Sequence, residues 1–110
     1  MNPKEDNFKS YSLKEKIIVN NIEFWELVIN PECQRKHPDI TDEVILELAE
    51  QLNGEEFTNG KIVKSWIYFA KEPLFDGKDN KAHRLVWCWP INNPSFLGIQ
   101  NCFRRRKYEK

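Results

Sequence analysis

The sequence predicts an α+β domain in which a small antiparallel, or partly mixed, sheet of four to five strands packs against one main helix. Three observations predict this class. A single amphipathic helical segment lies near the middle of the chain, two apolar β-rich segments precede it, and three more follow it. A length of 110 residues suits one domain. We therefore expect a polar N-terminal arm over residues 1–13 and a single domain over residues 14–110.

The first two strands are predicted to form a hairpin. Lys16–Val19 is rich in β-branched residues, and Ile22–Ile29 is a second apolar run. Asn20 and Asn21 lie between them, and asparagine tolerates the positive φ angles that a two-residue hairpin turn requires. A short helical turn is expected next, over residues 32–37, and Pro38 is expected to end it.

The central helix is predicted over residues 42–52 from its ends and its periodicity. Thr41 is a favourable N-cap, and the acidic residues that follow it suit the positive end of the helix dipole. Asn53-Gly54 supplies a C-terminal stop. One stripe of the segment, at a period of 3.6 residues, is apolar and consists of Val44, Ile45, Leu48, Ala49 and Leu52.

Three strand-like segments follow the helix, over residues 65–70, 83–89 and 96–103. The middle segment alternates, and this places Leu85, Trp87 and Trp89 on one side of the sheet. We expect that side to meet the helix, so that both tryptophans belong to the core rather than to a base-stacking surface.

Charge is balanced overall but unevenly distributed. The formal net charge is zero, which is unusual for a nucleic-acid-binding domain. However, every charged residue from Asp42 to Glu56 is acidic, whereas Glu109 is the only acid from His83 onward. A local field of this kind can still steer an anionic ligand within a Debye length of about 8–10 Å.

Two classes of protein are excluded by simple patterns. No apolar run reaches the roughly 20 residues that a membrane-spanning helix needs, and the N-terminus lacks the apolar stretch of a signal peptide, so we expect a cytoplasmic protein.

The chain contains three cysteines, which is an odd number, and Cys33, Cys88 and Cys102 stand at no metal-ligand spacing. Free thiols, no metal and no cofactor are therefore expected.

The C-terminal segment is the most distinctive part of the sequence. A strand-like run leads directly into Arg104-Arg105-Arg106-Lys107, and Tyr108 follows. Arginine presents a planar fork of donors that matches phosphate and carboxylate oxygens. The run therefore favours an anion-binding site, with a solvated, solubilising terminus as the alternative.

Short motifs in the same order carry a resemblance to a known family. The segments His83–Trp87 and Ile99–Tyr108 resemble the last two strands of the RelE/ParE toxin superfamily, in which a strand arginine precedes a basic pair and a tyrosine. The segment Lys36–Glu43 is similar to the helix start of the BrnT-like and DUF4258-like relatives of that fold. The resemblance implies a RelE-like fold and an endoribonuclease of a toxin–antitoxin pair.

The resemblance also implies roles for individual residues. Arg84 would hold the phosphate, Arg104 or Arg105 would stabilise the transition state of 2′-OH attack, and Tyr108 would transfer protons, with His83 as a further catalytic candidate. The binding candidates are Lys36, His37, Arg106 and Lys107. The implied partners are RNA, including ribosome-bound mRNA, and a cognate antitoxin protein, with no membrane.

The sequence departs from this family at Phe103, where many members carry histidine before the basic pair. The residues consequently indicate anion binding more directly than catalysis. The alternative function is a non-catalytic binding or regulatory module that uses the same basic strand to hold a protein partner or a nucleic acid. A convergent, concave arrangement of the candidate residues would favour the nuclease, and a flat one would favour the binding module.

Overall fold

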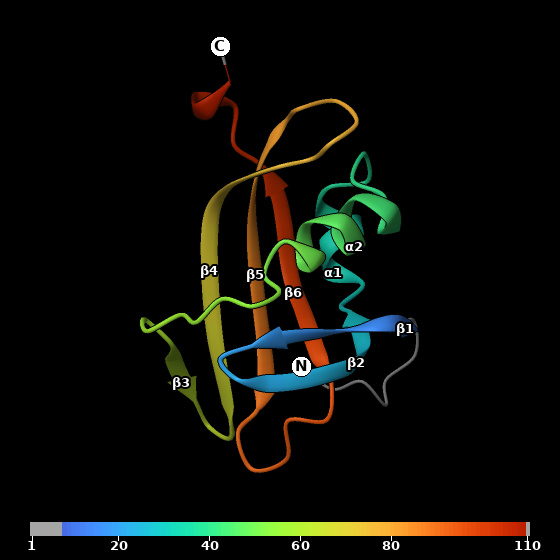
Figure 1. Cartoon of the computed structure of the whole chain (residues 1–110). Coiled ribbons are helices and arrows are strands. Elements are labelled where there is room, and N and C mark those ends of the chain that lie inside the picture. The colour runs from blue at the N-terminus through green and yellow to red at the C-terminus, as the bar shows by residue number, and fades with distance from the viewer. Residues whose placement is uncertain (1–7, 110) are drawn as a thin grey trace.

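A six-stranded mixed sheet forms most of the computed structural model, which describes residues 8–109 (Figure 1). The strand order is β1-β2-β6-β5-β4-β3, in which β2 and β6 run parallel and all other neighbours run antiparallel. The strands are β1 (Lys9–Val19), β2 (Ile22–Ile29), β3 (Lys61–Val63), β4 (Trp66–Phe75), β5 (Ala82–Pro90) and β6 (Leu97–Arg104). The helices are α1 (Glu32–Lys36) and α2 (Asp42–Glu50), and a 3-10 turn, η1, spans Arg106–Tyr108.

The predicted sheet of four to five strands against one main helix is therefore wrong. The domain is mostly β, because the sheet has six strands whereas α1 and α2 contain five and nine residues. The strand β3 was missed because its three residues lie in a polar connection and are too few to show a period. Part of the predicted N-terminal arm, Met1–Asn7, lies outside the described residues, and from Lys9 onward the chain already belongs to β1.

The hairpin between β1 and β2 has the predicted turn. Asn20 and Asn21 adopt φ angles of 53° and 63°, as the prediction required. The pairing is interrupted further along, because Ser12 pairs with Glu26 and Ile17 pairs with Phe24. The intervening part of β1 thus arches over a single residue of β2, which is the geometry of a large bulge.

The helix α2 begins where its sequence predicts. The hydroxyl oxygen of Thr41 accepts a hydrogen bond from the backbone N–H of Val44 at 3.3 Å, which satisfies one of the free donors of the first turn. The apolar stripe of the helix is buried against the sheet, with Ile45, Leu48 and Leu52 fully inaccessible. The chain leaves the helix through turns that end at Gly54, whose φ of 85° is costly for any residue with a side chain.

The core lies between α2 and one face of the sheet. Trp87 and Trp89 are 0% and 5% exposed, so the prediction that they are core residues is confirmed. Their rings pack against other aromatic residues, with centroids 5.9 Å apart for Phe69–Trp87 and 5.4 Å apart for Phe24–Trp89. This packing fixes which side of β5 faces the helix.

The helix α1 continues along β6 where β2 stops. β2 pairs with β6 only up to Ile29↔Ile99. The carbonyl oxygen of Ile99 then accepts hydrogen bonds from the backbone N–H of Asn30 at 3.0 Å and from the thiol of Cys33 at 3.6 Å. These contacts hold α1 beside β6, and they deliver His37, at the end of α1, to the carboxyl-terminal half of that strand.

The free edge at β3 and β4 is short and irregular. β3 pairs only with Trp66–Tyr68, and Pro73 lies within a bulge further along β4. Short edge strands and bulged prolines limit pairing with other chains. Within residues 8–109, no helix has the length and the apolar character that spanning a membrane requires.

Candidate functional site: an uncovered sheet face and a C-terminal cleft

Alternation along β5 divides the predicted site residues between the two faces of the sheet. His83 shares the helix-facing side with Leu85 and pairs with Arg104 of β6. Arg84 points to the opposite side and pairs with Phe103. His83 is only 4% exposed, and its Nδ1 atom finds no hydrogen-bond partner among the described residues. Its buried ring is therefore not accessible to a ligand at the surface.

The face that carries Arg84 is not covered by a helix. Because α2 occupies the other face, the residues of the central strands on this side stay in contact with solvent (Figure 1). The partly or fully exposed residues of this uncovered face include Lys61 on β3, Trp66, Tyr68 and Ala70 on β4, Arg84 and Val86 on β5, and Asn101 and Phe103 on β6. None of these residues lines any of the four main clefts of residues 8–109.

An ionic cluster lies on the uncovered face. The Glu72 carboxylate is 3.5 Å from Arg84 Nη1 and 2.6 Å from Arg105 Nε. The side chain of Glu72 is 18% exposed, against 37% and 31% for the two arginines. The short contact to Arg105 lacks the angle of a hydrogen bond, and both of its atoms are buried from solvent. Two guanidinium groups thus share one carboxylate.

An aromatic stack adjoins this cluster. The ring of His37 lies on the ring of Phe103, with centroids 5.6 Å apart and planes inclined by 28°. The guanidinium of Arg105 lies 5.9 Å from the Phe103 centroid, within cation–π range. His37, Phe103 and Arg105 are all partly exposed. They form a half-open platform with a positive charge over the Phe103 ring.

The remaining predicted residues gather at a C-terminal cleft. Arg104 donates two hydrogen bonds to Glu109, from Nε at 3.0 Å and from Nη2 at 2.7 Å, and the same carboxylate accepts from the backbone N–H of Ala82 at 2.9 Å. The hydrogen bonds from Arg104, followed by the one from Ala82, lower the pKa of Glu109 to about 2 despite some burial. Arg104, Tyr108 and Glu109 line a cleft of about 510 Å³ together with Phe75 and Lys81.

The structure therefore brings together only part of the predicted set. Arg84, Arg105 and His37 meet on the uncovered face, while Arg104 and Tyr108 line the C-terminal cleft. The other predicted binding residues, Lys36, Arg106 and Lys107, are exposed neighbours of these groups in the chain.

Two participants were missed by sequence reasoning. Glu72 is the one acidic residue of the largely apolar strand β4, which is a signal for an ion pair, but only the strand register shows its partners. Phe103 was noted only as a departure from histidine, and its contact with His37 depends on the placement of α1.

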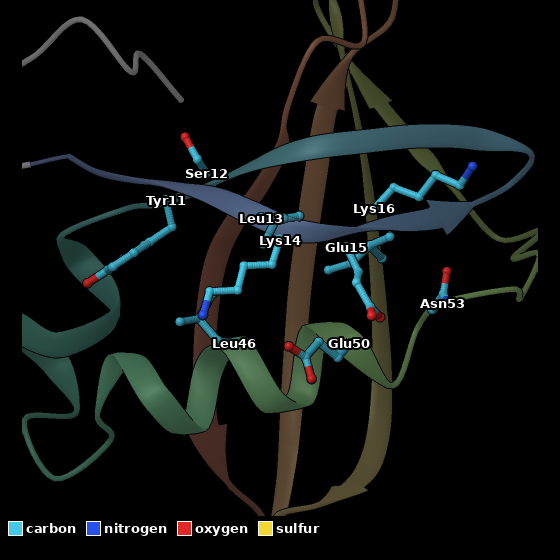
Figure 2. A pocket seen from close by; sticks show the side chains of 10 residues that line it. Tyr11, Ser12, Leu13, Lys14, Glu15, Lys16, Leu46, Glu50 and Asn53 are labelled. Carbon is cyan, nitrogen blue, oxygen red and sulfur yellow. The ribbon is translucent and has the colours of Figure 1, made fainter.

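A somewhat larger cleft lies elsewhere, between the arched part of β1 and α2 (Figure 2). It has a volume of about 560 Å³, and Lys14 reaches from β1 toward Leu46 of α2. Its lining mixes two lysines, Lys14 and Lys16, with two glutamates, Glu15 and Glu50. Because charges of both signs alternate there, the cleft shows no preference for an anionic ligand.

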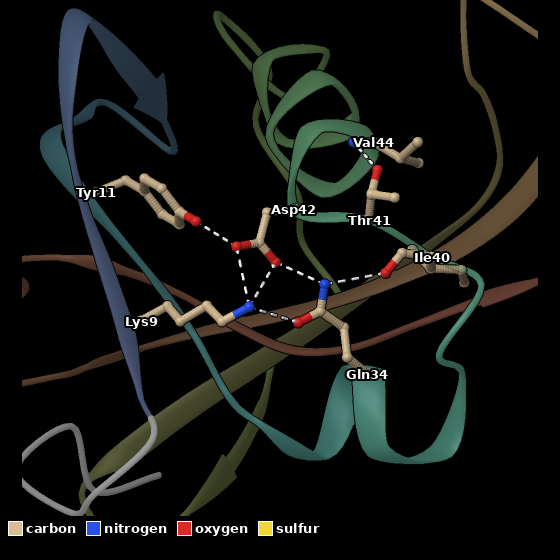
Figure 3. A network of polar contacts seen from close by, with 7 residues as sticks. All are labelled: Lys9, Tyr11, Gln34, Ile40, Thr41, Asp42 and Val44. Atoms are coloured by element: carbon tan, nitrogen blue, oxygen red, sulfur yellow. Dashed lines mark hydrogen bonds and ion pairs between the residues drawn. The ribbon is translucent and has the colours of Figure 1, made fainter.

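A polar network includes Tyr11, which also lines that cleft (Figure 3). The carboxylate of Asp42 accepts hydrogen bonds from Tyr11, from Lys9 at 3.3 Å and from Gln34 at 2.6 Å. Burial acts to raise the pKa of Asp42, but these donors outweigh it and the pKa is lowered. All of the donors come from neighbouring elements of the fold, so the network is structural.

The thiols and acidic groups form no further site among the described residues. Cys33, Cys88 and Cys102 are buried and unpaired, and burial raises the pKa of these thiols to about 11, 12 and 12 respectively. They are protonated and inert at neutral pH. Within residues 8–109 no group of three or more His, Cys, Asp or Glu side chains could hold a metal ion.

Comparisons of the chain with protein-family models, with curated proteins and with solved structures give no match. The resemblance to the RelE/ParE superfamily accordingly stays a prediction.

Proposed function

We propose that this domain is a non-catalytic binding module that holds a single-stranded nucleic acid across its uncovered sheet face. The observation that carries the proposal is the platform of His37, Phe103 and Arg105 beside the Arg84–Glu72 pair. It combines an aromatic surface with guanidinium groups on strands that no helix covers.

The chemistry of single strands suits such a face. Unpaired bases stack on exposed aromatic rings, and each stacked base contributes about 1–3 kcal/mol to binding. Arginine forks bind the phosphates between the bases. Phe103 and His37 would take one base, and Arg84 and Arg105 would hold the adjoining phosphate. Lys36 and Arg106, both exposed, would add further charge.

The arrangement favours binding over cleavage for a geometric reason. Cleavage by 2′-OH attack needs the phosphate ligand, the transition-state cation and the proton-transfer group around one phosphate. Here Arg84 lies on the uncovered face, whereas Arg104 and Tyr108 line the C-terminal cleft. Arg104 is also fully engaged with Glu109. Cleavage is accordingly an outcome of the test below rather than a second proposal.

The test is a binding measurement with fluorescein-labelled oligonucleotides of about 12 nucleotides. Single-stranded RNA and DNA of one sequence are compared with the corresponding duplexes by fluorescence anisotropy. We expect measurable binding of the single strands and at least tenfold weaker binding of the duplexes. Phe103→Leu and Arg84→Gln should each weaken single-strand binding by about 5- to 100-fold, as expected for the loss of one stacked base or one phosphate contact.

A matched control removes one charge elsewhere. Lys14 is exposed on β1 and lines the cleft beside α2 rather than the uncovered face, so Lys14→Gln should change the affinity less than twofold. Equal affinities of the wild type and Phe103→Leu would refute the proposal, as would an equal effect of Lys14→Gln. Gel analysis of the same samples detects cleavage, and 2′,3′-cyclic phosphate ends that disappear with Arg84→Gln would establish the nuclease instead.

A further inference from the structure

The position of Glu72 results from a bulge in β4. Lys71 pairs with Leu85 and Leu74 pairs with His83, so that Glu72 and Pro73 together lie opposite Arg84 alone. Bulges redirect a side chain, and this one places the Glu72 carboxylate between the guanidinium groups of Arg84 and Arg105. A regular strand would pair one residue with Arg84 and would not supply this extra position.

The carboxylate occupies the position that a ligand phosphate would require. A carboxylate and a phosphodiester each present two oxygens and one negative charge to an arginine fork. Arg84 and Arg105 therefore cannot both bind a phosphate fully while Glu72 holds them. With two cations and one anion, the cluster still has an excess of one positive charge that attracts an anion.

We propose that Glu72 is an internal competitor for the phosphate of the bound strand, an inference that rests on the proposed function. Binding exchanges the Glu72 carboxylate for a phosphate between Arg84 and Arg105, and the carboxylate turns to solvent. Because the exchange offers little gain by itself, a free phosphate binds weakly, whereas a strand that also stacks on Phe103 binds well. Glu72 thereby makes the face selective for a ligand that carries both a base and a phosphate.

The test uses Glu72→Gln, which keeps the shape of the side chain and removes its charge. The matched control is Glu109→Gln, which also removes one carboxylate from an arginine, but in the C-terminal cleft. We expect Glu72→Gln to bind the labelled single strand at least fivefold more tightly than the wild type does, and Glu109→Gln to stay within twofold. An unchanged or weaker affinity of Glu72→Gln, in a variant with a wild-type circular dichroism spectrum, would overturn the proposal.

A titration with inorganic phosphate separates this inference from the proposed function. The arginine Nε signals of ¹⁵N-labelled protein should shift at phosphate concentrations at least fivefold lower in Glu72→Gln than in the wild type. If no variant binds oligonucleotides but this difference holds, the proposed function fails and the competition stands. If the wild type binds oligonucleotides and phosphate affects both proteins equally, the competition fails alone.

A measurement on the wild type covers the case in which Glu72→Gln does not fold. The side-chain carboxyl carbon of ¹³C-labelled Glu72 reports whether the carboxylate leaves its arginines. Saturation with the single-stranded oligonucleotide should move this signal toward the position of an exposed glutamate, while that of Glu109 stays in place. An unmoved Glu72 signal under saturation would overturn the competition.

Discussion

At Asp42, donors from two other elements meet one carboxylate of α2. Tyr11 and Lys9 reach it from β1, and Gln34 reaches it from α1 (Figure 3). Hydrogen bonds to a charged acceptor contribute more to stability than those between neutral groups. The hydrogen bonds to Asp42 therefore link β1, α1 and α2 through side chains, and their loss should measurably lower the free energy of unfolding.

Replacing Tyr11 by phenylalanine should lower the free energy of unfolding by about 1–2 kcal/mol at pH 7. The hydrogen bond to Asp42 raises the pKa of Tyr11 and helps to lower that of Asp42. A lowered folded pKa means that the contribution is present above the ordinary Asp value of 3.8 and is lost as the pH falls through the folded value. The difference between wild type and variant, measured by urea unfolding, should therefore shrink below pH 3.8.

The control is Tyr68→Phe, since Tyr68 is half-buried on the uncovered face, where burial is the main cause that raises its pKa. This change should alter stability by less than about 0.5 kcal/mol. Equal effects of the two substitutions would show that the Tyr11 hydroxyl has no stabilising role.

Glu109 is predicted to make the stability of the domain depend on pH in the acidic range. Its pKa lies at about 2 in the folded chain, below the ordinary value of 4.5, because Arg104 and then the Ala82 backbone donate to it. Its contribution to stability is therefore complete above pH 4.5 and declines as the pH falls toward 2. A ¹³C titration of the carboxyl group should find a midpoint near 2, and Arg104→Gln should move it upward. A wild-type midpoint near 4.5 would contradict the observed pairing.

Among the elements, those fixed by neighbouring residues were the most predictable. The start of α2 at Thr41, its buried stripe and the Asn20-Asn21 turn all follow from side chains within a few positions of each other. Thr41 thus provides a test of how much a local signal contributes to the folded protein.

Thr41→Ala should reduce the free energy of unfolding by about 1 kcal/mol, because the Val44 N–H loses its acceptor at the helix start. Thr41→Ser keeps the hydroxyl and should stay within about 0.5 kcal/mol of the wild type. Urea unfolding measures both. A loss of the same size in Thr41→Ser would attribute the effect to the methyl group rather than to the cap.

The elements that depend on distant pairing were not predictable. The parallel contact of β2 with β6 and the extension of β1 back to Lys9 are set by partners about 20 or more residues away in the sequence. The residues of the candidate site also fall into two groups, those that the local sequence indicated and those that only strand pairing reveals. Arg105 was singled out as part of the C-terminal basic run and Arg84 through the family resemblance, whereas the bulge at Glu72 exists only in the register of β4 with β5.

At the scale of the whole molecule, zero net charge conceals a separation by face. The acidic helix α2 covers one face of the sheet, and Arg84 and Arg105 lie with His37 on the other. Fields of this kind act over about 8–10 Å at moderate salt, so a ligand on the uncovered face experiences the nearby cations more strongly than the distant carboxylates. Overall neutrality is therefore compatible with binding of an anion.

This separation predicts a moderate salt dependence of nucleic-acid binding. Arg84, Arg105, Lys36 and Arg106 can engage about three to four phosphates, and each phosphate contact on a single strand contributes about −0.7 to the slope of log K against log salt concentration. We expect a slope of about −2 to −3 between 50 and 250 mM salt. Arg84→Gln should make the slope shallower by about 0.7, the contribution of one phosphate contact, and Lys14→Gln should leave it unchanged. A slope near zero would indicate binding by stacking alone, and a slope much steeper than −3 would place the strand along a longer basic surface than the uncovered face provides.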